Sequence, residues 1–354
     1  MMRTARKTAG LATAFGALAV VLAACGGGVN SASSSSEAAA SAPAASAAAS
    51  AAASAAGSAA ASPAASAAAA VPCGDWGVAM NNWVGYTASA EVLTQVAKQK
   101  LGCNITQTKL DEANVSYDAM EAGSVDLIIE DWGGGRWKDW VDRGAIQEVG
   151  SDGNIGLIGM YVPKWMAEKY PDITDGTNLN KYADLFKTAE SGDKGAWYEG
   201  PPGYTTIGQK IIDAYGLNFK AINVGSEQAL IDLMEKGQKD QKAALAYFWE
   251  PHYYLANDTV ARVNFPANDW SDAKKASGKT DYPKTDLMKL ATTKLMESGS
   301  PFAALVKNWQ WTNADQNSVA LDIQNGATPT EAAQKWIDAN PDKVAAWLQG
   351  TGAA

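Results

Sequence analysis

Short apolar runs alternate with amphipathic segments along most of this 354-residue chain, and this alternation limits its fold more than any other feature. Runs with strand character recur at 76–80, 105–110 and 125–129. Between the first two lies 88–101, which has helical periodicity and stops at Gly102. A strand–helix–strand order of this kind predicts βαβ units on a parallel sheet, and therefore an α/β fold.

A second α/β group follows the first. Its strand-like runs are 154–162, 196–198, 221–224 and 243–248, and its helical segments are 164–170, 207–215 and 227–236. The chain returns through an apolar run at 260–265. From Thr285 to its end it is expected to be helical, over 286–297, 300–306, 312–325, 331–340 and 342–348.

A chain that leaves one lobe, builds a second and comes back crosses between them twice. This layout predicts two α/β lobes with a hinge and a ligand cleft between them. The first lobe is expected to comprise 73–158 plus 256–354, and the second 159–255.

The first 25 residues have the pattern of an export signal. A basic stretch ending at Lys7 precedes a short apolar segment, 11–22, which is too short for an ordinary membrane span. Leu22-Ala23-Ala24-Cys25 follows, and a small-residue cleavage site ending in Cys resembles the bacterial lipobox, whose Cys is lipidated. We therefore expect 1–25 to be a lipoprotein signal peptide with lipidation at Cys25. The alternative is ordinary secretion with a free Cys25.

Residues 26–72 are almost entirely Ala, Ser, Gly and Pro, with Glu37 as the one charged residue. Such a segment cannot bury a core, so it is expected to be a disordered tether. No apolar run of spanning length follows it, which predicts an extracytoplasmic protein anchored by lipid at the outer face of the membrane. Removal of the three basic residues before Cys25 takes the net charge from −9 to −12. An acidic surface argues against nucleic acid as a partner.

Two cysteines remain after the signal, Cys73 and Cys103. Each comes just before a strand-like run, and the starts of two neighbouring parallel strands lie side by side. An exported compartment permits disulfides. The positions therefore predict a Cys73–Cys103 disulfide, with two buried thiols as the alternative.

Residues suited to catalysis are scarce. His252 is the only histidine, so a Ser/His or Cys/His site has a single candidate base. The sequence has no clustered His or Cys ligands and no phosphate-binding glycine motif, so we expect no metal and no cofactor. Glu130 and Asp131 at a strand end leave a glycosidase-type pair open, although a surface acidic cluster is the simpler interpretation. We expect a protein that is not an enzyme, with a cell-wall hydrolase as one alternative.

Tryptophan is abundant, with 13 in the chain. Trp83, Trp132 and Trp249 each lie at or next to the end of a strand-like run, and Tyr161 and Tyr204 have comparable positions. The carboxyl ends of parallel strands open on one crevice. Several electron-rich rings around one crevice predict a cage for a quaternary ammonium group. For any single Trp, packing in the core or between lobes is the alternative.

Several segments, taken in order, resemble the substrate-binding proteins of ABC transporters for glycine betaine, choline and proline betaine. They are 82–86, 126–132, 159–163, Trp249-Glu250-Pro251-His252, which matches the family's W-x-P-H signature, and 332–336, 340–341 and 347–348. The resemblance covers about 74–350. It implies a periplasmic-binding-protein-like fold that closes on a small quaternary ammonium compound and delivers it to an ABC permease in the membrane.

By position, the resemblance implies cage walls at Trp83, Trp132, Tyr161 and Trp249. It also implies that a ligand carboxylate is held by backbone N–H groups near Gly85 and Tyr86, with His252 as a further candidate. An extracytoplasmic sensor or adhesion module on the same fold is the alternative from another functional class.

The chain departs from the family's usual short Gly-rich turn at 199–206. There Tyr204 is expected to add a ring, and Thr205 and Thr206 to offer hydrogen bonds. Negative charge at Glu199, Glu130 and Asp131 would favour choline over zwitterionic betaine, but the sequence leaves that choice open. It also leaves the role of Glu250 open.

Overall fold

The computed structural model describes residues 71–112, 114–267 and 271–353. The expected signal peptide, Cys25 and nearly all of the expected tether lie outside these residues. Within the part that the structure describes, no helix is both long and apolar enough to span a membrane.

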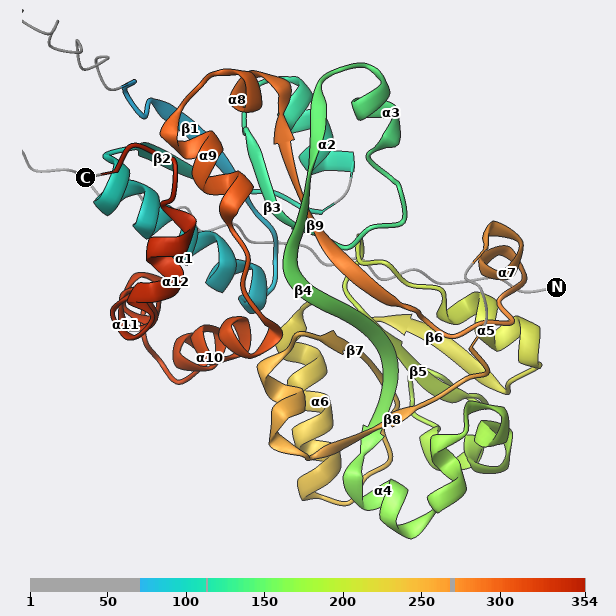
Figure 1. Cartoon of the computed structure of the whole chain (residues 1–354). Helices are drawn as coiled ribbons and strands as arrows, with labels where there is room; N and C mark the ends of the chain where they lie inside the picture. Colours follow the sequence, from blue (N-terminus) through green and yellow to red (C-terminus); the bar gives the residue numbers. More distant parts are fainter. Residues whose placement is uncertain (1–70, 113, 268–270, 354) are drawn as a thin grey trace, which may run out of the picture. The chain divides into compact units, whose positions relative to one another are not determined.

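The described residues form one mixed β-sheet flanked by helices (Figure 1). The strands are β1 (Asp75–Met80), β2 (Asn104–Lys109), β3 (Leu127–Asp131), β4 (Ile146–Pro163), β5 (Gly195–Glu199), β6 (Phe219–Asn223), β7 (Ala246–Glu250), β8 (Val260–Val263) and β9 (Lys284–Thr292). Their order across the sheet is β2-β1-β3-β9-β4-β7-β5-β6, and β8 pairs with β4. This architecture confirms the α/β class.

The sheet consists of two parallel groups joined by antiparallel strands. In the first group, which we name the β1 half, β2 and β3 both run parallel to β1. In the second, the β7 half, β6 and β7 both run parallel to β5. Strands β4 and β9 pair antiparallel between the two groups, and Figure 1 shows β4 as a long green strand that reaches both.

Helices cover the faces of both halves (Figure 1). Their bounds are α1 (Val84–Leu101), α2 (Asn114–Glu121), α3 (Lys138–Asp142), α4 (Lys164–Lys169), α5 (Gly208–Tyr215), α6 (Glu227–Lys239), α7 (Asp272–Ser277), α8 (Thr293–Glu297), α9 (Pro301–Asn308), α10 (Asn313–Gln324), α11 (Pro329–Ala339) and α12 (Pro341–Trp347), with 3₁₀ turns at Pro171–Thr174, Gly176–Phe186 and Tyr253–Asn257. Helix α1 packs against α9, α10 and α11. It ends at Gly102, whose left-handed backbone (φ 64°) is the stop that the sequence predicts.

One predicted helix is wrong. Residues 286–297 were expected to be helical, but Lys284–Thr292 is strand β9 and a helix begins only at Thr293. Strand β9 lies between β3 and β4, and Leu287, Leu290 and Ala291 are fully buried there. Ladder hydrogen bonds and burial on both sides override the helical preference of Leu, Lys and Ala.

Two parts of the chain after β7, 260–263 and 280–282, contact the end of β4 and the β7 half. Strand β8 pairs with the last residues of β4, and the backbone N–H of Ile207 in the loop before α5 donates to the Tyr282 hydroxyl at 2.7 Å. Arg262 donates to both oxygens of Asp281, at 2.9 and 3.0 Å. These contacts associate the two parts with the β7 half, whereas the sequence predicts that 256–354 belongs to the first lobe. The lobe boundaries themselves stay a prediction.

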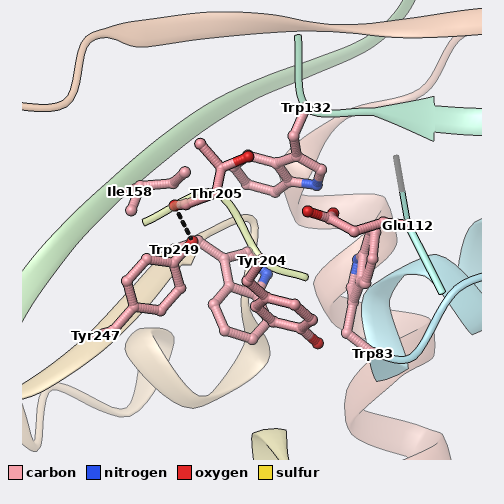
Figure 2. Close-up of a pocket in the computed structure, with 8 residues that line it drawn as sticks. All are labelled: Trp83, Glu112, Trp132, Ile158, Tyr204, Thr205, Tyr247 and Trp249. Atoms are coloured by element: carbon pink, nitrogen blue, oxygen red, sulfur yellow. Dashed lines mark hydrogen bonds between the residues drawn. The ribbon is translucent and has the colours of Figure 1, made fainter. Parts of the chain in front are cut away.

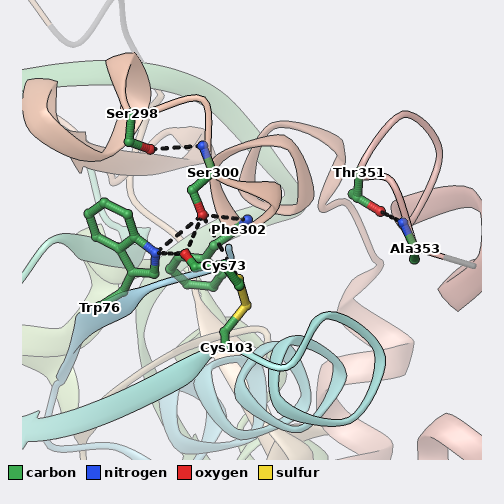
Figure 3. The surroundings of a disulfide bond; sticks show 8 residues. All are labelled: Cys73, Trp76, Cys103, Ser298, Ser300, Phe302, Thr351 and Ala353. Atoms are coloured by element: carbon green, nitrogen blue, oxygen red, sulfur yellow. Dashed lines mark hydrogen bonds between the residues drawn. A yellow bond between two sulfur atoms is a disulfide. The ribbon is translucent and has the colours of Figure 1, made fainter. Parts of the chain in front are cut away.

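Cys73 and Cys103 form a disulfide in the structure, with Cα atoms 4.8 Å apart (Figure 3). The two residues precede β1 and β2, which pair in parallel from Asp75 and Asn104 onward. The Cys73 carbonyl accepts the Trp76 indole N–H and the Ser300 hydroxyl, both at 2.6 Å. The start of the fold is thereby joined to β2 and to the N-cap of α9.

Candidate ligand-binding site

A small cavity lies where the β1 half and the β7 half meet, and most of its wall is aromatic (Figure 2). The residues that line it, which we call the cage, are Trp83, Glu112, Trp132, Ile158, Tyr204, Thr205, Tyr247 and Trp249. Its volume is about 10 Å³, about the smallest that admits one water molecule. A trimethylammonium group is larger than water, so the walls must separate to admit one.

Strand ends bring the rings together. Trp83 follows β1 at the start of α1, and Trp132 follows β3. Tyr204 lies in the loop after β5, whereas Trp249 lies within β7 at its carboxyl end. The carboxyl ends of parallel strands in each half thus face a common crevice, as the strand-end positions in the sequence predict.

Tyr204 is the ring that connects the two halves. Its centroid lies 5.8 Å from that of Trp83 and 5.5 Å from that of Trp249, edge-on to both. Its hydroxyl donates to the Asn82 carbonyl at 2.9 Å. The loop after β5 is therefore held against the turn between β1 and α1.

Thr205 offers an unused hydrogen-bonding group. Its Oγ1 is buried without a protein partner, and its carbonyl accepts the Tyr247 hydroxyl at 3.1 Å (Figure 2). A buried hydroxyl without a partner is costly, so a polar ligand atom at this position would be stabilised.

Glu112 brings negative charge to the cage. Its carboxylate points into the space between Trp83 and Trp132 (Figure 2) and lies 3.4 Å from an Arg136 guanidinium nitrogen. Burial raises the pKa of Glu112 to about 7, although Arg136 opposes the rise. Glu130, beside the cage, accepts the indole N–H groups of both Trp83 and Trp132.

Residues 77–339 match the family described as the substrate binding domain of ABC-type glycine betaine transport systems. The chain belongs to this family. A curated relative, the glycine betaine/carnitine transport binding protein GbuC of Listeria monocytogenes, is 27% identical over 129 residues. The match covers 36% of this chain and 39% of the relative, so the chain spans about two fifths of that protein's length.

Solved structures have the same fold as this substrate-binding domain. Lactococcal OpuAC, in its closed-liganded conformation complexed with glycine betaine, is 21% identical and gives a TM-score of 0.62 over 78% of this chain and 99% of its own. A choline binding protein of an ABC transporter, in complex with choline, is 18% identical. It gives a TM-score of 0.64 over 78% of this chain and 92% of its own.

The structure places Tyr161 away from the cage of this substrate-binding domain, which corrects its predicted role as a cage wall. On β4, Ile158 pairs with Trp249, whereas Tyr161 pairs with Ala246. Side chains alternate between the faces of a strand, so Tyr161 lies on the opposite face from Trp249. There it packs edge-on against Phe248, with centroids 6.1 Å apart.

His252 also lies outside the cage lining. Its ring packs edge-on against Trp249 with centroids 4.7 Å apart, and Nδ1 accepts the Tyr254 backbone N–H at 3.2 Å. Its Nε2 lies 3.0 Å from Oε1 of Glu227 on α6. The histidine therefore supports Trp249 from behind and faces a carboxylate of the protein itself.

The predicted carboxylate-binding backbone at the start of α1 does not line the cage either. Oε2 of Glu227 accepts the Val84 N–H at 2.9 Å, so a protein carboxylate already lies at this helix N-terminus. A Cβ on Gly85 would collide with the Gln316 amide. Tyr86 is fully buried, and its hydroxyl accepts the Ile129 N–H at 3.2 Å.

The other acids singled out from the sequence do not line the cage. Asp131 is buried and accepts from the Tyr117 hydroxyl and the Gly133 N–H. Glu199 accepts the Trp197 indole N–H at 2.9 Å, and Glu250 is exposed. Sequence reasoning missed four residues of functional interest, Glu112, Ile158, Tyr247 and Glu227. Tyr247 had a usable signal, because it lies two residues before Trp249 on a strand and therefore shares its face.

Proposed function

We propose that the cage binds the cationic head of a small quaternary ammonium compound. The observation that carries this proposal is a single cavity with five aromatic rings and one carboxylate in its wall. Ring faces attract cations, each by roughly 1–2 kcal/mol when desolvated. Several such rings give an affinity near micromolar, on the order of −8 kcal/mol after ordering costs.

Within that class, we propose choline or a similar net cation ahead of zwitterionic glycine betaine. A larger cavity of about 410 Å³ adjoins the cage and shares Trp83, Glu112 and Tyr204 with it. Asp111 lines this adjoining cavity as well. The described residues that line the two cavities include two acids, Glu112 and Asp111, and no lysine, arginine or histidine. Glu227 already holds the Val84 N–H, so a ligand carboxylate would meet acids and find few donors.

We further propose that the protein performs no chemistry. It acts outside the cytoplasm and delivers its ligand to an ABC permease in the membrane. Membership of a transport substrate-binding family supports this role. The lipobox-like stretch ending at Cys25 supports a lipid anchor.

Ligand admission requires the two halves to separate, because the cavity is smaller than the ligand head. We propose a hinge through β4 and β9, the strands that lie between the two halves in the sheet. On this view, 260–263 and 280–282 move with the β7 half, because they contact the adjoining end of β4 and the loop before α5.

Calorimetric titration with choline, glycine betaine, carnitine and proline betaine tests the proposal. Choline is expected to bind most tightly. Its carbon isostere, in which a tert-butyl group replaces trimethylammonium, is expected to bind at least about tenfold more weakly, because it lacks the cation. Equal affinity for the isostere, or no binding by the whole quaternary set, contradicts the proposal.

Variants at Tyr204 supply the matched control. Tyr204→Ala removes a ring and is expected to weaken choline binding about tenfold. Tyr204→Phe keeps the ring and removes only the hydrogen bond to Asn82, so its loss should be smaller. Trp249 is less suitable, because it is 3% exposed and truncation of a buried Trp costs about 3–5 kcal/mol of stability.

A further inference from the structure

Glu130 lies on β3 beside the cage and is 1% exposed. Its Oε1 accepts the indole N–H of Trp83 at 3.1 Å and that of Trp132 at 2.9 Å. Its Oε2 accepts from Gln316 Nε2 at 2.9 Å and from Ser89 Oγ at 3.3 Å. One carboxylate therefore fixes the orientation of two cage rings that come from different elements.

All four donors to Glu130 are uncharged, so its negative charge is hydrogen-bonded but not neutralised. A buried carboxylate without a cationic partner is costly. Burial accordingly raises the pKa of Glu130 to about 7, against the opposing effect of the four donors. A cation between the rings would supply the missing positive charge. An indole that donates to an anion is also more electron-rich, which strengthens the attraction of its face for a cation.

The charged groups around Glu130 do not provide this neutralisation. Asp152 on β4 is connected to it through Asn154 and Gln316, and its pKa is raised by burial and by Glu130. The ammonium of Lys289 on β9 donates to backbone carbonyls and attracts Asp152.

The acids on the cage side add negative charge rather than remove it. Glu112 and Asp131 lie near Glu130, and each has a pKa raised by burial. The cation near these acids is Arg136, which pairs with Glu112 and acts on Asp131. The ligand cation is therefore the natural countercharge of Glu130.

We infer that Glu130 is a positioning residue of the cage: its carboxylate orients Trp83 and Trp132 and is the buried countercharge of the bound cation, so cation binding and protonation of Glu130 oppose each other. When the cation enters, the protonated carboxyl group releases its proton to solvent. This inference rests on the proposed function and adds to it a dependence of affinity on pH.

Glu130→Gln tests the inference, because it keeps the shape and an acceptor oxygen for the indoles and removes the charge. Choline affinity is measured by calorimetry between about pH 5.5 and about pH 8.5, on either side of the Glu130 pKa. The wild-type affinity should rise with pH up to about 7 and then level off. Glu130→Gln should bind about 10- to 100-fold more weakly at the high end and lose most of the slope.

Glu199→Gln is the matched control. Glu199 is also buried, has a pKa raised to about 7 and accepts an indole N–H, but from Trp197, which does not line the cage. This variant should retain wild-type affinity and slope. A similar loss in both variants would show that removal of any buried charge loosens the fold, and would overturn the inference.

Proton release separates Glu130 from Glu112, which titrates in the same range and lines the cavity. Release is measured for the Glu112→Gln variant near pH 7, from binding heats in two buffers of different ionisation enthalpy. We expect release to persist there and to vanish when Glu130→Gln is added. If Glu112→Gln alone abolishes release, or if Glu130→Gln binds as wild type does, the inference is wrong. The proton release of Glu112→Gln alone tests the inference even if Glu130→Gln does not fold. Failure of the proposed function looks different: the wild type then binds no quaternary ammonium at any pH.

Discussion

Among the eight described residues that line the cage, Glu112 alone has a carboxyl group. Its carboxylate attracts the cationic head of any ligand, but it also repels a ligand carboxylate. Choline has no carboxylate, whereas glycine betaine does. Glu112 should therefore act on the choice between them more than on affinity in general.

Glu112→Gln is expected to weaken choline binding by about 3- to 10-fold and to leave glycine betaine binding unchanged or stronger. Competitive titration of the two ligands measures the ratio. Glu121→Gln is the control, because Glu121 pairs with Arg143 on the exposed surface of the β1 half. An equal change in both affinities would mean that Glu112 does not select between them.

Strand periodicity determines which cage residues a sequence can reveal. Trp83, Trp132, Trp249 and Tyr204 follow from their strand-end positions, and the structure places all four around one cavity. Tyr161 has a similar position in the sequence, but the pairing register, which the sequence does not show, puts it on the other face. Glu112 was missed because an acid after an exposed strand resembles ordinary surface charge.

At the scale of elements, a contact between helices couples the two halves. Glu227, the first residue of α6, accepts the first N–H of α1 through one oxygen and lies 3.0 Å from His252 through the other. Trp83 provides no side-chain cap for α1. The β7 half thus supplies the cap for a helix of the β1 half, and the cap forms only when the halves are together.

Glu227→Ala is expected to destabilise the closed arrangement by about 0.5–2 kcal/mol, the usual value of an N-cap. Hydrogen exchange at the first turn of α1 should accelerate. Choline affinity should fall by about 2- to 30-fold, the same free energy expressed as a ratio. Glu235→Ala, which removes an exposed acid of the same helix, should change neither quantity. Unchanged exchange at Val84 in Glu227→Ala would exclude the coupling.

The same cap explains where sequence-based boundaries fail. Periodicity predicts the first helix from residue 88, but α1 begins at Val84, because its cap comes from a residue more than a hundred positions away. The predicted helix at 286–297 fails for a related reason, since β9 exists only through its pairing with β3 and β4. In contrast, the helix predicted at 331–340 is present as α11, whose start is fixed locally by a capping box between Thr328 and Glu331.

At the scale of the whole molecule, five carboxyl groups with raised pKa values connect stability with pH: Asp131, Asp152 and three glutamates. Burial raises the pKa values of Glu112, Glu130 and Glu199 from 4.5 to about 7. Between these values the folded protein binds more protons than the unfolded chain does, so the free energy of unfolding falls as pH rises. Asp315, whose pKa is lowered, acts in the opposite direction only below its usual range. Lys289, with a pKa lowered to about 8, acts only above that value.

The melting temperature of the ligand-free protein should therefore be highest near pH 4.5 to 5 and fall by several degrees by about pH 7.5. Scanning calorimetry at fixed ionic strength measures this profile. Glu199→Gln should reduce the slope, because it removes one of these groups and leaves the cage intact. Saturating choline should also reduce it, because the cation favours the charged forms of Glu130 and Glu112. A melting temperature that rises from pH 5 to pH 7 would mean that these carboxyl groups are ionised in the folded protein at acidic pH, and that water or neighbouring dipoles already compensate their charge without the ligand.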